Sequence, residues 1–163
     1  MPHADDPLLP SILDRLLDHA PDVSTEPAWS WTQDVGEMKA SVMRDLEALL
    51  NTRQTRSDLM RDAPDAEIAQ SVLTYGLPDL TSVGAASPEA REALRWAVEE
   101  AIRRFEPRLM DVRVSASDVE DAFDRTLRLT VEAWLAMDPE PVPVVFDTVV
   151  ESSTGAYQVK AGS

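Results

Sequence analysis

The hydrophobic pattern of this chain changes its period at Pro107, and that change limits the folds open to it. Ser87 is a good N-cap and Pro88 suits the first helical position, so the sequence predicts a helix from there to Phe105. Pro107 ends this helix, because proline disfavours the helical region at Glu106 and lacks an N–H. The apolar residues recur at spacings of three and four, which is typical of one helix face; they are Ala90, Leu94, Ala97, Val98, Ala101, Ile102 and Phe105.

Beyond Pro107 the apolar residues alternate with period two, which is typical of strands. Pro143 suggests an edge strand or the start of a strand. Four short strands cannot close a barrel, so we expect at least one open edge and one face covered by the Leu94–Phe105 stripe. The predicted strands are built on Met110, Val112 and Val114; on Leu127 to Leu135; on Val142 to Val150; and on Tyr157 and Val159.

Helices are also predicted upstream. Asp34 opens a capping-box pattern, and the helix that follows ends near Asn51. A shorter helix at residues 65–75 is stopped by Gly76 and is expected to bury Ile68, Val72 and Leu73. The fold class is therefore α+β, with N-terminal helices and one long central helix packed on a small, mainly antiparallel sheet of three to four strands. We divide the chain into a Pro-rich acidic segment with a short helix, residues 1–32, and a single domain, residues 33–163.

The composition argues against several kinds of site. There is no cysteine, so disulfides and thiolate metal sites are impossible, and two histidines argue against a metal cluster or a histidine-based triad. The five glycines form no phosphate loop or dinucleotide fingerprint, and a net charge of −15 argues against nucleic acid as a partner. No apolar run approaches a membrane span, and the N-terminus lacks the pattern of a signal peptide. We therefore expect no cofactor, no metal, no nucleic-acid partner and no direct membrane insertion.

Paired carboxylates are the one catalytic class that the composition leaves open. With 30 acidic residues a pair can always be nominated, so the nomination carries little information. Glu106, fixed beside Pro107, is the best acid candidate, although a salt bridge or a cap accounts for it better. Trp96 lies opposite the apolar stripe and is either covered by a second layer or a contact residue; Trp29 and Trp31 pack on this domain or on a partner.

Five motifs occur in a fixed order along the chain. They are SVMRDLEALLNTR at residues 41–53, SVLTYGLPDL at 71–80, IRRFEPRL at 102–109, FDT at 146–148 and STGAY at 153–157. Together they resemble the TssE family, the small baseplate wedge subunits of bacterial type VI secretion systems. That family is itself similar to a wedge protein of contractile-tailed phages that was once labelled an acidic lysozyme.

This resemblance implies a structural role. TssE-like subunits join the wedge with TssF, TssG and TssK, and their sheet is thought to template the first ring of the TssB/TssC sheath by strand addition. An open sheet edge fits that role, because its unpaired N–H and C=O groups can bind another chain. The family's Glu-Pro-Arg motif falls on Glu106, Pro107 and Arg108, which implies a part in wedge packing and assembly.

These observations lead to one hypothesis and two alternatives. We expect a non-catalytic structural subunit, cytoplasmic and located at a baseplate docked on the inner membrane, which joins the wedge and templates the sheath through a sheet edge. The alternatives are a muramidase that cleaves peptidoglycan and an acidic adaptor unrelated to secretion. If the motif is a docking site, Arg108→Glu abolishes sheath assembly and leaves a folded monomer; if it is a core salt bridge, the isolated protein unfolds. The candidate partner-binding residues are Glu106, Pro107, Arg108, Val144, Phe146 and Thr148.

Overall fold

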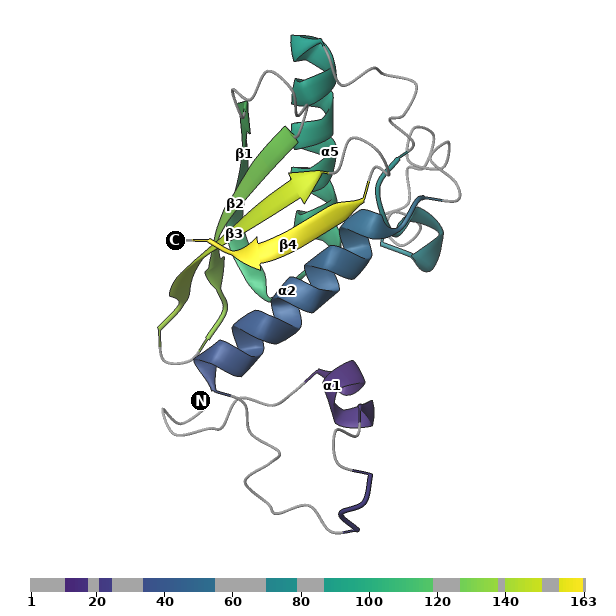
Figure 1. Ribbon diagram of the computed structural model, residues 1–163, viewed down its shortest axis with the longest axis vertical. Coiled ribbons are helices and arrows are strands. Elements are labelled where there is room, and N and C mark those ends of the chain that lie inside the picture. Colours follow the sequence, from purple (N-terminus) through teal and green to yellow (C-terminus); the bar gives the residue numbers. More distant parts are fainter. Residues whose placement is uncertain are drawn as a thin grey trace.

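A four-stranded antiparallel sheet follows the long helix, as predicted (Figure 1). The strands lie side by side in their sequence order, so β1 and β4 are the two edges. Their bounds are Leu109–Asp118 for β1, Leu127–Leu135 for β2, Val142–Val150 for β3 and Tyr157–Ala161 for β4. The computed structural model describes residues 11–17, 21–24, 34–54, 70–78, 87–118, 127–137, 140–150 and 156–162.

Helix α5, Pro88–Phe105, is the long central helix and packs on one face of the sheet (Figure 1). Its start is as predicted: the Ser87 hydroxyl accepts a hydrogen bond from the Ala90 N–H, and Pro88 occupies the first turn. Two ion pairs between residues four positions apart lie along the helix, Glu99 with Arg103 at 2.8 Å and Glu100 with Arg104 at 2.6 Å. The predicted apolar stripe faces the sheet; its buried members are Ala90, Ala97, Val98, Ala101 and Ile102.

Helix α2, Val35–Asn51, completes the helical layer and crosses beside β4 (Figure 1). Asp34 and Glu37 form the predicted capping box, each side chain accepting from the other residue's backbone N–H. The helices and the inner face of the sheet share one hydrophobic core. Its largest fully buried side chains include Phe146, Leu46, Ile102, Leu129 and Leu135.

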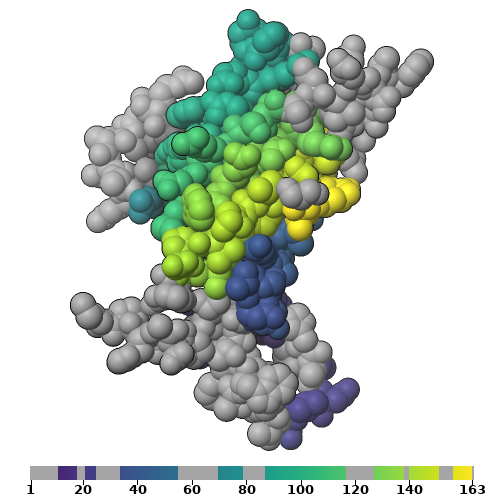
Figure 2. All heavy atoms as spheres, turned by 90° about the vertical axis from the view of Figure 1, so that its left-hand side faces the viewer, coloured from purple at the N-terminus to yellow at the C-terminus, as the bar shows by residue number. Residues whose placement is uncertain are grey.

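The opposite face of the sheet carries no helix in the described part of the chain. In β2 the predicted alternation holds: Leu129, Val131, Ala133 and Leu135 are buried, whereas Arg128, Glu132 and Trp134 are exposed. Figure 2 looks onto this face, where the strands run as bands of green to yellow atoms. In the described residues the domain therefore has two layers, the helices and the sheet, and the outer face of the sheet carries exposed side chains.

A bulge in β1 overturns one prediction from the alternation. Met110 pairs with Trp134 and Arg113 pairs with Glu132, so two residues of β1 lie opposite one residue of β2. Asp111, inside the bulge, has φ 51°. The extra residue moves Met110 to the solvent side, where it is 39 % exposed, and the prediction that it shares a face with Val112 and Val114 is wrong.

Other expectations about burial also need correction. Of the two alternatives for Trp96, burial under a second layer is not seen among the described residues, because its side chain is 60 % exposed. The segment before Gly76 contains a short 3-10 helix, η2, Val72–Thr74, in which Val72 and Leu73 are exposed and not buried. Gly76 itself has φ 100°, in agreement with the predicted left-handed stop. Ile68, Trp29 and Trp31 lie outside the described residues.

The predicted short N-terminal helix is α1, Ile12–Leu16. None of its residues is buried, and its apolar side chains are exposed. The division of the chain at residue 32 stays a prediction, since residues 25–33 lie outside the described part. Each helix that is described is too short or too polar to span a bilayer.

Candidate functional site

The Glu106–Pro107–Arg108 motif forms the corner between α5 and β1. The Glu106 N–H donates to the Ile102 carbonyl at 2.9 Å and closes the last helical turn, so Glu106 is the C-cap. The Leu109 N–H then donates to the Glu106 carbonyl at 3.1 Å, which turns the chain into β1. Pro107 is exposed at this turn, whereas Glu106 is only 4 % exposed. The motif thus presents its proline to solvent and its carboxylate to the interior.

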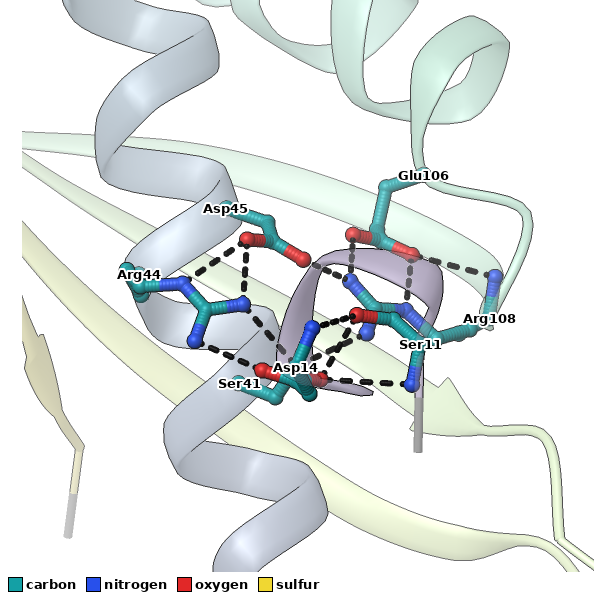
Figure 3. A network of polar contacts seen from close by, with 7 residues as sticks. All are labelled: Ser11, Asp14, Ser41, Arg44, Asp45, Glu106 and Arg108. Carbon is teal, nitrogen blue, oxygen red and sulfur yellow. Dashed lines mark hydrogen bonds and ion pairs between the residues drawn. The ribbon is translucent and has the colours of Figure 1, made fainter. Parts of the chain in front are cut away.

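Arg108 binds that carboxylate with both arms of its guanidinium group (Figure 3). Arg108 Nε donates to Glu106 Oε1 and Nη2 donates to Oε2, each at 2.6 Å. Arg108 also reaches α2, where Nη2 contacts Asp45 Oδ2 at 2.6 Å and Nη1 donates to Ser41 Oγ at 3.0 Å. The planar, bidentate pair, a strong form of ion pair, holds the Arg108 guanidinium on Glu106 within the corner. Its bonds to Asp45 and Ser41 then fix the corner to α2.

The network continues from α2 to α1 (Figure 3). Arg44 contacts Asp45 at 2.9 Å and Asp14 of α1 at 2.7 Å. Ser41 donates to Asp14 at 2.7 Å, and Ser11 shares a capping box with the same carboxylate. Polar side chains therefore hold α1 on α2.

The charged forms of Arg108 and Asp14 in this network are strongly stabilised. Hydrogen bonds from the Arg108 guanidinium to Glu106 raise the pKa of Arg108 well above its usual range, and Asp45 adds to this against the opposing effect of burial. Burial raises the pKa of Asp14, but hydrogen bonds from Ser11, Ser41 and Arg44 outweigh it and hold that pKa well below its ordinary value of 3.8. Arg108 and Asp14 are thus charged throughout the physiological range.

This geometry suits a structural lock better than catalysis. Glu106 is buried and already accepts two bonds from Arg108, whereas a glycosidase acid faces a cleft opposite a second carboxylate. A hollow of about 430 Å³ lies along α2, where Arg44 of the network lines it and Glu47 is the carboxylate among its described lining residues. Among the residues that the structure describes, no group of three or more His, Asp or Glu could hold a metal ion.

The three candidates on β3 lie in the core. Val144, Phe146 and Thr148 are 3 %, 2 % and 1 % exposed, and β3 is paired on both sides. Of the two readings of Pro143, the start of a strand is confirmed, because it is the second residue of an interior strand. In the free chain an incoming strand cannot pair with β3, so the edges available to a partner are those of β1 and β4.

The β4 edge is partly occupied by side chains of α2. Asn51 Nδ2 donates to the Tyr157 carbonyl at 2.8 Å, and the Tyr157 N–H donates to Asn51 Oδ1 at 2.9 Å. Glu47 accepts from the Val159 N–H at 3.2 Å. These side chains make bonds that a fifth strand would make, so this part of the β4 edge is protected.

The β1 edge is similarly occupied by a charged row on α5. Arg103 Nη2 donates to the Val112 carbonyl at 2.8 Å, and Arg95 Nη1 donates to the Val114 carbonyl at 3.3 Å. Glu99 accepts from the Val114 N–H at 3.1 Å. The spacing of four residues lets Glu99 and Arg103 pair along a helix, but nothing in the sequence pattern shows that this row contacts the backbone of β1.

Comparison with known proteins places the chain in a family. Residues 36–140, well over half of the chain, match the family of baseplate wedge protein gp25. A chain in the solved baseplate complex from the type VI secretion system is similar with a TM-score of 0.49 and 17 % identity, over 72 % of this chain and 97 % of that one.

A curated relative is the anti-adapter protein IraD of Salmonella paratyphi A (strain ATCC 9150 / SARB42). It is 35 % identical over 82 residues, which are 48 % of this chain and 60 % of IraD, so the match spans less than two thirds of that protein. The family match includes the α5–β1 corner and both strands of the first hairpin, and it confirms the wedge-family resemblance of the sequence motifs. This chain belongs to the family of baseplate wedge protein gp25.

Proposed function

We propose that this chain is a non-catalytic structural subunit of a type VI secretion baseplate, which joins the wedge proteins TssF, TssG and TssK and templates the TssB/TssC sheath. The observation that carries the proposal is its membership of a baseplate wedge family, matched over residues 36–140. The contacts of Glu106 support a non-catalytic role, because both of its carboxylate oxygens already accept hydrogen bonds from Arg108.

The proposed location follows from the partners. A subunit that joins TssF, TssG and TssK works on the cytoplasmic side of the inner membrane, where the baseplate docks. A high negative charge supports docking on basic surfaces of those partners, since complementary charge speeds and orients association.

The proposed mechanism of templating is strand addition at an edge of the sheet. Main-chain hydrogen bonds would supply the affinity, and side chains that alternate above and below the sheet would set the register. Because β3 is interior, Val144, Phe146 and Thr148 would act indirectly, by holding the sheet on which the edges depend.

Co-purification tests the assignment. The tagged chain is expressed with TssF, TssG and TssK in one experiment and with the TssB/TssC pair in another, and the expected result is capture of both sets. Capture of neither set contradicts the proposal; capture of the wedge set alone leaves a baseplate role and removes the templating role.

Peptidoglycan digestion tests the muramidase alternative, and the expected result is no release of fragments. Fragment release by the pure protein, lost in Glu106→Gln but kept in the matched variant Glu100→Gln, would establish an enzyme in place of a scaffold. Glu100 suits this control because it is paired on the surface of α5 with Arg104.

A further inference from the structure

We infer that β1 is the edge that accepts a partner's extended strand, and that Arg95, Glu99 and Arg103 form a clasp which closes this edge until the strand arrives. The inference rests on the proposed function and names the site at which its strand addition takes place. Three observations carry it: the groups that the clasp occupies, the length of β1, and the charge of the clasp.

The clasp occupies backbone groups that an added strand requires. In an edge strand, alternate residues point their N–H and C=O away from the sheet. Arg103 holds the Val112 carbonyl, while Arg95 and Glu99 hold the carbonyl and the N–H of Val114. These contacts imitate one side of a strand ladder, so a partner strand and the clasp exclude each other.

The lengths of the two edges favour β1. β1 has ten residues and continues past the clasp to Ala116 and Asp118, whereas β4 has five residues. A strand that enters at Ala116 could form its first bonds before it displaces the clasp. At β4, the Asn51 side chain bonds both the carbonyl and the N–H of Tyr157. Fewer backbone groups of β4 are therefore free to pair with an added strand.

The chemistry of the clasp allows release without loss of its charge pairs. Glu99 binds Arg95 at 2.9 Å and Arg103 at 2.8 Å, both within α5. The three side chains can leave β1 and remain paired with one another, and the Arg103 side chain is already 51 % exposed. Opening therefore exposes no unpaired charge, which keeps its cost small.

Site-specific crosslinking identifies the edge. The chain has no cysteine, so Ala116→Cys and Ala161→Cys, both at exposed positions, can each carry a benzophenone maleimide. The probe protein is the sheath pair of the co-purification experiment. Capture through position 116 and not 161 is expected. Capture through 161 alone overturns the assignment to β1, and capture through neither position while co-purification persists overturns strand addition at both edges but leaves the wedge role standing.

Clasp variants test the closing role. Glu99→Ala removes the acceptor of the Val114 N–H and the carboxylate that Arg95 and Arg103 share, although Arg95 keeps its pair with Glu92. The association rate with the sheath pair is therefore expected to rise about fivefold. Glu100→Ala, which loses the comparable pair with Arg104, is expected to leave the rate unchanged. Circular dichroism confirms folding, and Arg103→Met, which releases only the Val112 carbonyl, replaces Glu99→Ala if that variant does not fold.

The Glu99→Ala experiment also distinguishes a clasp that controls sheath binding from one that only protects the edge against aggregation. A clasp that only protects the edge predicts self-association of Glu99→Ala with no change in its rate of sheath binding, and that outcome overturns the inference. Slower sheath binding overturns it as well, because it would mean that Glu99 contacts the partner directly.

Discussion

Replacing Arg108 by methionine tests whether the Glu-Pro-Arg corner is a core lock or a docking site. The Glu106 side chain is 6 % exposed and accepts both arms of the Arg108 guanidinium, and Asp45 is the second carboxylate on the same group. Without the cation, Glu106 remains as a buried charge with no counter-ion from Arg108, a change that costs about 3–5 kcal/mol in buried pairs. The side chains of Arg108 and Asp45 are 23 % and 26 % exposed, so solvent weakens the effect and we expect a loss of about 3 kcal/mol, the lower end of this range.

The assays are urea unfolding and thermal unfolding of the isolated chain at neutral pH, both followed by circular dichroism. The melting temperature should fall by about 6–12 °C, since a chain of this length loses about 2–4 °C per kcal/mol. Arg113→Met is the matched control, because Arg113 is exposed in the same strand and its loss is expected to change stability by less than about 0.5 kcal/mol.

A double-mutant cycle then assigns the loss to the pair. Adding Glu106→Gln to Arg108→Met removes the orphaned charge, so the two changes should couple by at least about 1 kcal/mol. Arg108→Glu places a like charge beside Glu106 and Asp45, and we expect it to destabilise the free protein further. If Arg108→Met is as stable as the Arg113 control, the core-lock reasoning is refuted and the motif is left as a docking site.

Three further predictions concern single positions. Thr148→Val should stabilise the chain by about 1 kcal/mol in urea unfolding, because Thr148 Oγ1 is buried with no hydrogen-bond partner among the described residues; equal or lower stability would show that the hydroxyl is satisfied. The pKa of Asp14 is lowered in the folded protein, so the chain should have a higher free energy of unfolding than the Asp14→Asn variant. This difference should be constant above about pH 5 and should shrink as the pH falls below about 4, where the carboxylate of the unfolded chain becomes protonated. A difference that does not depend on pH contradicts this. Gly76→Ala should lower the free energy of unfolding by about 2 kcal/mol or more, because φ is 100° and the new Cβ would collide with the Thr52 carbonyl; a neutral result would mean that the turn relaxes.

Local patterns predicted the elements of the sheet and the two long helices well. Ser87 with Pro88, and Asp34 with Glu37, begin helices because their side chains and backbone satisfy orphan N–H groups within one turn. The alternation from Leu127 to Leu135 gave β2 its bounds and its buried face. Such features depend on neighbours three or four residues away, or on alternate residues, and are visible in the sequence.

Features that depend on distant contacts were not visible. The bulge at Asp111 follows from pairing with β2, and it reversed the side on which Met110 lies. Trp96 stayed exposed because no element in the described structure packs over the outer side of α5, which the helix's own pattern could not show.

The sequence by itself determined the class of fold, the caps of the long helices and the membership of a wedge family, because these rest on short-range spacing and on ordered motifs. Only the tertiary structure decided that β3 is interior, that Arg108 locks α5 to α2, and that α2 and α5 cover part of each sheet edge. The physical reason is that these hydrogen bonds join residues 15 to 106 positions apart and form only when the layers pack together. The spacing of apolar residues predicts which face of one element is buried, but not which elements then lie in contact.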